Sequence, residues 1–289
     1  MGKVAKLIMV TAENNNKYYS MTEQPDGTFK VVYGRVDVTA INESYSMGMW
    51  EKKYKEKLKK GYVDQTHLFA VEPDPSDDKD KDKTSPSFAD IMDPTISRFV
   101  SQLQAWANKT VEQNYKISTA SVTAKQIDAA QTILDSLSHM VNIGVSLNDI
   151  NQLLLDLFKT LPRKMGHVQD YLFTTISDKD DLDSAIKLLS HEQDLLDVFK
   201  GQVQVYAAQQ AQNITSTKEE TKRKTLLEAM GIEFFNTIDS EKETILSKIQ
   251  DPSHKKQISQ SFRVNNKKTQ ERFDKWVSET ANKKTELFW

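Results

Sequence analysis

Cysteine is absent from this chain of 289 residues. Its absence excludes disulfides, thiolate metal sites and a cysteine nucleophile. The nine glycines stand singly, so the chain has no GxGxxG fingerprint and no Walker loop that would cradle phosphates. No stretch approaches the ~18–20 apolar residues of a membrane-spanning helix, and the short apolar run Val4–Val10 does not fit a signal peptide. We therefore expect an intracellular protein, in the cytoplasm, nucleoid or nucleus, without a membrane partner.

Motifs of independent catalysis are also missing. The five histidines lie far apart along the chain and show no HExxH or similar ligand spacing, so no metal site is predicted. No nucleophile-elbow motif supports a Ser-His-Asp arrangement, although the sequence alone leaves such an arrangement open. We assign no catalytic residue in this chain.

Charge is nearly balanced, with 39 Lys and Arg against 41 Asp and Glu, but it is unevenly distributed. Residues 255–284 carry nine basic against three acidic side chains, whereas residues 73–88 carry five Asp against three Lys. A basic segment of this kind weakly favours a polyanionic partner and says nothing about the fold.

The first seventy residues are predicted to be rich in β-strands. Many β-branched and aromatic residues occur in three segments: Val4–Thr11, Lys17–Gln24 and Phe29–Val36. Pro25-Asp26-Gly27 separates the last two segments and predicts a hairpin, because Pro fixes φ and Gly accepts a positive φ.

A helix is predicted after these strands. Met47, Trp50, Tyr54 and Leu58 recur at helical spacing with lysines on the opposite face, and Gly61 is a stop signal. A short strand near His67–Val71 would complete the unit. Residues 73–87, rich in Pro, Asp and Lys, read as a solvated linker.

Residues from Phe88 to about Gln212 are predicted to form helices throughout. Pro94 is expected to start the first helix. Its apolar face would carry Ile96, Phe99, Leu103, Trp106 and Val111.

Three further helical segments follow in this region. One is expected from about Thr123 to Asn142 with a stop at Gly144, and the next is capped by Ser146 or Asn148 and ended by Pro162. Asp178–Phe199 predicts either a helix pair or one long helix. Several helices with short connections favour an antiparallel bundle.

Mixed patterns return after Ala211. Ile232–Ile238 and Ile258–Val264 are predicted to be strands. Between them, Ser240–Ile249 is predicted to be a helix capped by Ser240, with Glu243 at the capping-box spacing. These strands are too few to form a sheet with two covered faces.

The strongest local candidate for binding is Tyr33-Gly34-Arg35, at the end of a predicted strand. An aromatic ring, a glycine and an arginine together could stack on a terminal base or sugar and hold a phosphate. The segment Trp50–Lys60 adds six lysines, which could supply salt-sensitive attraction to a nucleic acid. The alternative is a tyrosine in an ordinary sheet beside an amphipathic helix with a solvated lysine face.

The same segments resemble a WGR domain, a module named for its Trp-Gly-Arg motif. The matching stretches are Asn16–Tyr19, Tyr33–Val36, Trp50–Lys57 and Lys60–Tyr62. Tyr33 stands where the family has Trp, so the planar surface is smaller. In the family the Trp and Arg contact the end of a broken DNA strand, and the resemblance implies this role for Tyr33 and Arg35. It also implies close backbone approach at Gly34 and a phosphate contact by Lys57.

The helical region resembles the regulatory domain of poly(ADP-ribose) polymerases. Lys125–Leu134 matches a Gln-Ile-x-x-Ala-x-x-Ile-Leu signature, Phe158–Pro162 matches the next helix end, and Asp181–Glu192 matches the closing helices. In that family the bundle covers the NAD pocket and inhibits activity until DNA-end binding destabilises it. The resemblance therefore implies coupling between a DNA site and a catalytic site through an element of low stability.

The last part resembles the start of the family's catalytic domain. Leu226–Ile238 is similar to its first strand, and Phe262–Trp289 to the approach to a His-Gly-Ser-Arg loop that grips NAD. The catalytic His, Tyr and Glu of the family would follow Trp289, so the resemblance maps neither a catalytic nor an NAD-binding residue onto this chain. It implies no cofactor here, with NAD as substrate only where a completed domain is supplied, for instance by a second polypeptide.

We therefore predict an α+β, multidomain chain. A small β-sheet plus helix forms a WGR DNA-binding domain at 1–72, followed by a linker at 73–87. An α-helical regulatory bundle spans 88–213, and an incomplete α/β segment spans 214–289.

Two functions remain open for this chain. The first is the DNA-break-sensing and autoinhibitory portion of an NAD-dependent poly(ADP-ribose) polymerase-like ADP-ribosyltransferase, inactive as this chain alone, with DNA ends or nicks as partners. The second is a non-catalytic WGR module that holds DNA ends as a competitor or an architectural protein.

Overall fold

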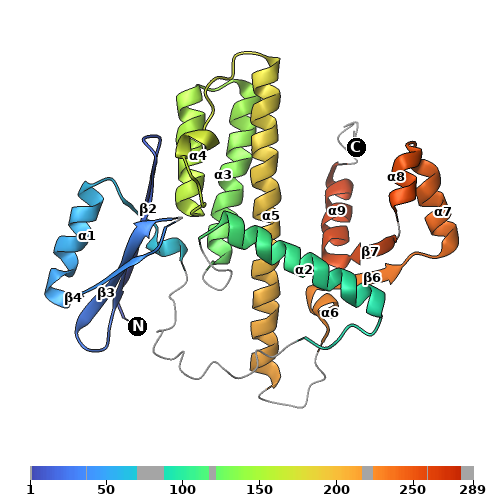
Figure 1. Ribbon diagram of the computed structural model, residues 1–289, viewed down its shortest axis with the longest axis horizontal. Coiled ribbons are helices and arrows are strands. Elements are labelled where there is room, and N and C mark those ends of the chain that lie inside the picture. The colour runs from blue at the N-terminus through green and yellow to red at the C-terminus, as the bar shows by residue number, and fades with distance from the viewer. Residues whose placement is uncertain are drawn as a thin grey trace. The chain divides into compact units, whose positions relative to one another are not determined.

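The computed structural model describes residues 2–36, 38–69, 88–116, 122–216, 224–258 and 260–280. These residues form mixed α and β structure, with an antiparallel sheet, several long helices and a separate strand pair (Figure 1). The chain divides into two compact units, Met1–Asp82 with Ala105–Tyr206 and Lys83–Gln104 with Ala207–Trp289. The predicted linker at 73–87 and the segment Leu287–Trp289 lie outside the described residues.

The first unit contains a sheet with the strand order β4-β3-β2-β1-β5, antiparallel at every junction. Its strands are β1 (Val4–Thr11), β2 (Asn15–Glu23), β3 (Thr28–Arg35), β4 (Ile41–Ser46) and β5 (Val63–Asp64). The three long predicted strands and their hairpin are confirmed. The strand predicted near His67–Val71 is wrong where the chain is described, because Thr66–Leu68 forms a 3-10 turn and the short edge strand lies earlier.

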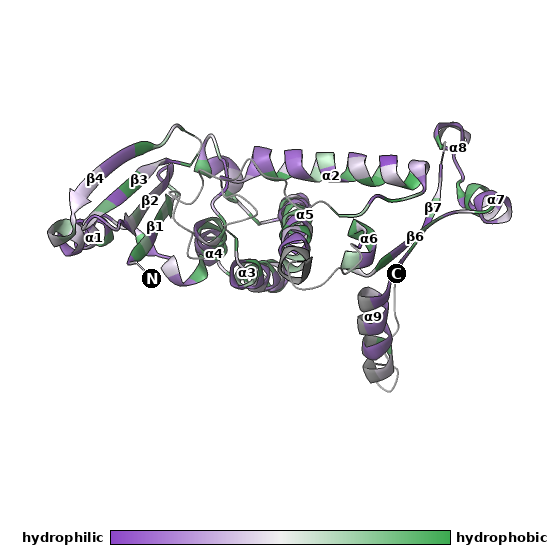
Figure 2. Ribbon diagram, turned by 90° about the horizontal axis from the view of Figure 1, so that it is seen from below, coloured by the Kyte–Doolittle hydropathy of each residue, from purple (hydrophilic) through white to green (hydrophobic). Residues whose placement is uncertain are grey.

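Helix α1 (Trp50–Lys59) covers one face of this sheet. Trp50 is buried against Phe29, with ring centroids 5.1 Å apart in an edge arrangement. The remaining buried members of this core are Ala5, Leu7, Tyr19, Met21 and Val31. Figure 2 shows both hydrophilic and hydrophobic residues along the strands of this sheet. This mixture is expected because successive side chains of a strand point to opposite faces.

The helical part of the first unit is built from α3 (Ala124–Ile143), α4 (Leu147–Thr160) and the first part of α5 (Lys179–Ser216). Thr123 and Gln126 form a reciprocal capping box at the start of α3, and Gly144 ends it in the left-handed conformation at φ 72°. Ser146 caps α4, as predicted. After Asp178 the chain forms one long helix, α5, which is one of the two predicted alternatives; the helix pair is not formed.

A second core joins this bundle to the other face of the sheet. Ile8 and Val10 of β1 lie in one cluster with the bundle's buried leucines and Phe158. Helix α2 (Pro94–Asn114) starts at Pro94 as predicted and buries Ile96, Val100 and Val111. The prediction that Leu103 and Trp106 lie on the same inward face is wrong, because they are 45% and 58% exposed.

The second unit contains α6 (Leu226–Met230), β6 (Ile232–Asn236), α7 (Asp239–Lys248), α8 (Pro252–Gln257), β7 (Phe262–Asn266) and α9 (Lys267–Thr280). Two strands were predicted here, the second at Ile258–Val264; the structure places it later, at Phe262–Asn266, and pairs it antiparallel with β6. The predicted cap at Ser240 is wrong. The helix begins one residue earlier, and the Ile238 amide donates to the Glu241 carboxylate at 3.2 Å.

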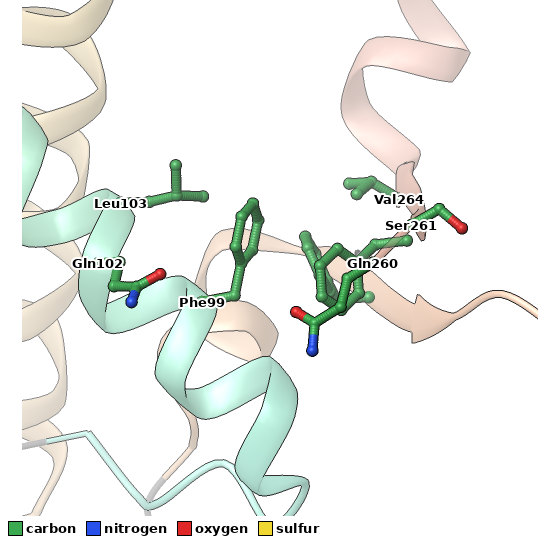
Figure 3. A pocket seen from close by; sticks show the side chains of 8 residues that line it. Phe99, Gln102, Leu103, Gln260, Ser261 and Val264 are labelled. Atoms are coloured by element: carbon green, nitrogen blue, oxygen red, sulfur yellow. The ribbon is translucent and has the colours of Figure 1, made fainter. Parts of the chain in front are cut away.

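A pocket of about 710 Å³ lies in this second unit. Phe99 and Leu103 project into it from α2, and Gln260, Ser261 and Val264 face them from the β7 side (Figure 3). The Phe99 and Phe262 rings stack with centroids 4.8 Å apart. Gln102 and Phe234 also border this pocket, and no titratable side chain is among the described residues that line it. In the described ranges, no helix combines the length and the apolarity that crossing a bilayer requires.

Candidate nucleic-acid interface

Tyr33 lies on β3, where register places it opposite Tyr19 of β2 and Ile41 of β4. Its side chain is half-buried, and its ring lies 5.6 Å from the Tyr19 ring at a 39° tilt. The hydroxyl donates to Glu43 at 3.1 Å, and this hydrogen bond raises the pKa of Tyr33. The predicted stacking residue is therefore held in a fixed orientation on the α1 side of the sheet.

Lys57 is brought to the same place by α1. Its ammonium lies 4.2 Å from the centre of the Tyr19 ring and 5.7 Å from those of Tyr33 and Tyr62. Burial lowers the pKa of Lys57, with nearby Lys60 acting in the same direction. We call Tyr19, Tyr33, Lys57 and Tyr62 the tyrosine–lysine cluster. Two of the four predicted site residues thus belong to one cluster.

An acidic side chain lies next to this cluster. Glu43 accepts hydrogen bonds from the hydroxyls of Tyr33 and Tyr45, and the Tyr45 contact is the main cause of its lowered pKa. Lys53 donates to the Tyr45 hydroxyl at 3.1 Å and lies 4.1 Å from the centre of that ring. A phosphate at Tyr33 would therefore meet the Glu43 carboxylate unless it approached from the lysine side.

Gly34 makes only ordinary contacts in this structure. A Cβ added there would lie 3.6 Å from the Thr39 carbonyl oxygen and 3.9 Å from the Tyr18 hydroxyl. The close approach that the sequence predicts at this glycine stays a prediction.

Arg35 is directed away from the tyrosine–lysine cluster. Its guanidinium donates to the Asn14 carbonyl at 2.8 Å, to the Asn14 side chain at 3.0 Å, and to the carbonyls of Met165 and Gly166 at 3.2 and 2.7 Å. Asn14 turns the chain between β1 and β2 with a positive φ of 64°, which Asn tolerates better than most residues. Arg35 thus connects the sheet to the segment that joins α4 and α5.

Further hydrogen bonds strengthen this connection. The Asn14 side chain accepts from the Val168 amide at 3.0 Å, and the buried Asn16 side chain donates to the Arg163 carbonyl at 2.8 Å. We call these contacts of Asn14, Asn16 and Arg35 with the segment Arg163–Val168 the sheet–bundle joint. They link residues well over a hundred positions apart, which no local pattern in the sequence indicates.

Three exposed lysines of α1 lie outside the cluster. Lys52, Lys55 and Lys59 recur at helical spacing, which places them on one side of the helix. Among the described residues, none of them forms an ion pair, although the charge of Lys55 helps to lower the pKa of Glu51. The two glutamates of the helix pair with other lysines: Glu51 with Lys3 at 2.8 Å and Glu56 with Lys60 at 2.6 Å. We call these three lysines the lysine row. The prediction for Trp50–Lys60 included them, but it did not foresee that Lys57 would point into the tyrosine–lysine cluster while these three remain exposed.

The described residues contain no group of three or more His, Cys, Asp or Glu side chains that could hold a metal ion. The arrangement in the first unit is instead one of cations and aromatic rings on a sheet and a helix, which is chemistry for binding a polyanion. Tyr19 and Tyr62 belong to it although they were not assigned a role. From the sequence, Tyr19 could be placed only on a predicted strand and Tyr62 only after a predicted helix, and neither position indicated binding.

Comparison with known proteins gives one clear relationship. No protein-family model matches the chain. The chain is 32% identical over 204 residues to a protein of Invertebrate iridescent virus 6 described as uncharacterized protein 101L, an alignment that covers 71% of this chain and 79% of the viral protein. At this identity and coverage the two share a fold and an origin, and the chain belongs to the same family as that iridescent virus protein.

Proposed function

We propose that this chain is the DNA-break-sensing and autoinhibitory portion of an NAD-dependent poly(ADP-ribose) polymerase-like ADP-ribosyltransferase that works inside the cell. In this proposal the sheet with α1 is a WGR domain, the bundle is a regulatory domain, and β6 with β7 begins the catalytic domain. The carrying observation is the sheet–bundle joint. It connects the sheet, whose α1 side carries Tyr33, to the bundle on the opposite side, as sensing followed by regulation requires.

DNA would be held by two groups of side chains with different roles. The lysine row of Lys52, Lys55 and Lys59 supplies exposed positive charge to the phosphates. Tyr33 and Lys57 supply a ring and a cation at the strand end for a terminal nucleotide. Arg35 contributes to binding by fixing the sheet–bundle joint, in addition to any contact with a phosphate.

A second candidate is a non-catalytic module that holds DNA ends. The observation that favours it is the lining of the 710 Å³ pocket of the second unit, which is mostly aromatic and aliphatic and, among the described residues, holds no titratable group. Such a lining offers no general acid or base, and the Ser261 hydroxyl has no base beside it among these lining residues. In this alternative the chain holds DNA ends as a competitor or an architectural protein, and the apolar surfaces of the second unit serve contact with another protein.

The two candidates differ in their reaction with NAD. Purified chain is incubated with NAD and nicked DNA, and released nicotinamide is quantified. Nicotinamide release that depends on nicked DNA would exclude the non-catalytic module. If release appears only after a second polypeptide with the missing catalytic residues is added, the first candidate is supported.

The DNA-binding part of the proposal is tested through its salt dependence. We expect the variant with Lys52, Lys55 and Lys59 all changed to Gln to lower the slope of log K against log salt by about 3, since each phosphate contact contributes about 1. The measurement is fluorescence anisotropy on a nicked duplex between 50 and 200 mM salt (roughly the range over which such contacts are lost).

A matched control removes the same charge elsewhere in the first unit. Lys125, Lys179 and Lys187 are exposed on the bundle helices, and changing all three to Gln should leave the slope nearly unchanged. Equal slopes for wild type and the lysine-row variant would show that α1 does not face DNA.

A further inference from the structure

An ion pair is buried inside the bundle. Arg163 follows the end of α4 and Glu192 lies on α5, and their side chains are only 2% and 4% exposed. The Nη1 atom of Arg163 lies 3.2 Å from Oε2 of Glu192. The layer around them otherwise consists of Tyr115 and apolar side chains, with Leu134 of α3 and Leu157 of α4 among them.

In the described structure, the guanidinium of this pair lacks hydrogen bonds that burial would normally require. Within the described part of the protein, neither Nε nor Nη1 of Arg163 has a hydrogen-bond partner of acceptable geometry, although Nη1 is within ion-pair distance of Glu192. The adjacent cavity measures about 10 Å³, which is at the lower limit for a single water molecule. The guanidinium instead lies 5.4 Å from the Tyr115 ring centre and 5.6 Å from that of Tyr171.

Such a pair costs free energy. Removing two charges from water is repaid only when geometry is good and the remaining polar atoms are hydrogen-bonded, so a misaligned buried pair is less stable than apolar side chains of similar volume. Neighbouring layers of the bundle contain fully buried Leu137, Leu154 and Phe199, which carry no such cost. The stability of the bundle is therefore lower at this layer than on either side.

We propose that the Arg163–Glu192 pair is a built-in weak point of the bundle, at which α5 separates from α3 and α4 before the rest of the core opens. Because the Arg163 carbonyl accepts the buried hydrogen bond from Asn16, this weak point adjoins the sheet–bundle joint. A change in the sheet that moves the buried Asn16 side chain therefore acts directly on the backbone of Arg163. The weak point is a property of the fold and does not depend on the proposed function.

The charges near Glu192 determine how this layer responds to pH. Arg163 faces it from the α4–α5 segment, Tyr115 from the end of α2, and His191 from its own helix, while α3 and α4 contribute only apolar side chains to the cavity. Burial raises the pKa of Glu192, and Arg163 opposes this only in part. A raised pKa means that the folded state binds the proton more tightly, so this layer gains stability as pH falls through that pKa.

The first test replaces both charges at once. We expect the variant Arg163→Met with Glu192→Leu to melt about 3–8 °C higher than wild type. We also expect slower amide exchange across residues 185–199 of α5. The single variant Glu192→Leu, which leaves Arg163 without its partner, should melt lower than wild type. A double variant that melts at or below wild type and exchanges faster in α5 contradicts the proposal.

A milder variant keeps the test valid if the double variant packs badly. Glu192→Gln preserves volume and removes the titrating charge. It should abolish the slowing of amide exchange that wild-type residues 185–199 show as the pH falls from 7 through the raised pKa of Glu192, after correction for intrinsic exchange rates. If Glu192→Gln and wild type show the same pH dependence in these residues, Glu192 does not control opening and the proposal fails.

Discussion

The two compact units bury their large apolar side chains to different extents. In the first unit, Trp106 is exposed, but Phe29, Phe158 and Phe199 are completely buried, each between elements that are distant in the sequence. In the second unit, Phe235 is 42% exposed and Val264 is 54% exposed on a pair of strands with little covering them. Both units contain well-formed local structure, but among the described residues only the first has a second layer over each apolar face, and a two-stranded sheet alone is marginal in water.

The largest difference is expected from truncating one phenylalanine in each unit. Phe158→Ala should reduce the free energy of unfolding of the first unit by about 3–5 kcal/mol, because it leaves a cavity in a closed core. Phe235→Ala should reduce that of the second unit by less than about 1 kcal/mol, because much of its ring is already in water. Peptide-resolved hydrogen exchange measures both effects in the full chain. Similar losses for the two variants would refute the contrast in burial.

A smaller effect is expected at the sheet–bundle joint. Asn16→Ala removes the buried hydrogen bond to the Arg163 carbonyl and should cost about 1–3 kcal/mol, since it leaves that carbonyl unsatisfied. Asn15→Ala is the control, because Asn15 bonds only to side chains near the surface. Urea unfolding of the two variants tests the joint. An Asn16 variant as stable as the control would mean that the sheet and the bundle are held by apolar packing alone.

The smallest effect is expected for the corresponding amide of the second unit. Asn236 donates to Asp93 at 2.7 Å, but both groups are exposed, so water replaces the contact when it is lost. Asn236→Ala should change exchange rates in β6 by an amount equivalent to less than about 0.5 kcal/mol. A loss as large as that of Asn16→Ala would indicate that the second unit is more tightly packed than its exposed side chains suggest.

Local chemistry made much of the fold predictable. The capping box at Thr123 and the left-handed Gly144 mark α3 because both satisfy backbone groups within a few residues. The strands β1, β2 and β3 follow from runs of β-branched and aromatic residues. Strand β4 was missed because Asn42, Glu43 and Ser44 are polar, as suits an exposed edge strand.

Tertiary contacts explain the remaining differences. Helical periodicity placed Leu103 and Trp106 on an inward face, yet periodicity states only which residues share a face and not whether that face is covered. For the candidate site, the sequence indicated Tyr33 and Lys57, which the fold brings together. It could not indicate that Arg35 would bind backbone carbonyls 130 and 131 residues away, since that contact depends on how the sheet meets the bundle.

The most direct test of the account is whether the chain distinguishes broken from intact DNA. Binding of the purified chain is measured by fluorescence anisotropy on a nicked duplex and on a matched closed duplex that has no free ends, at one salt concentration. We expect the nicked duplex to bind at least about tenfold more tightly, equivalent to 1.4 kcal/mol, and Tyr33→Ala to remove this preference. Equal affinity for the two duplexes, or no binding to either, would contradict the proposal that this sheet senses DNA breaks.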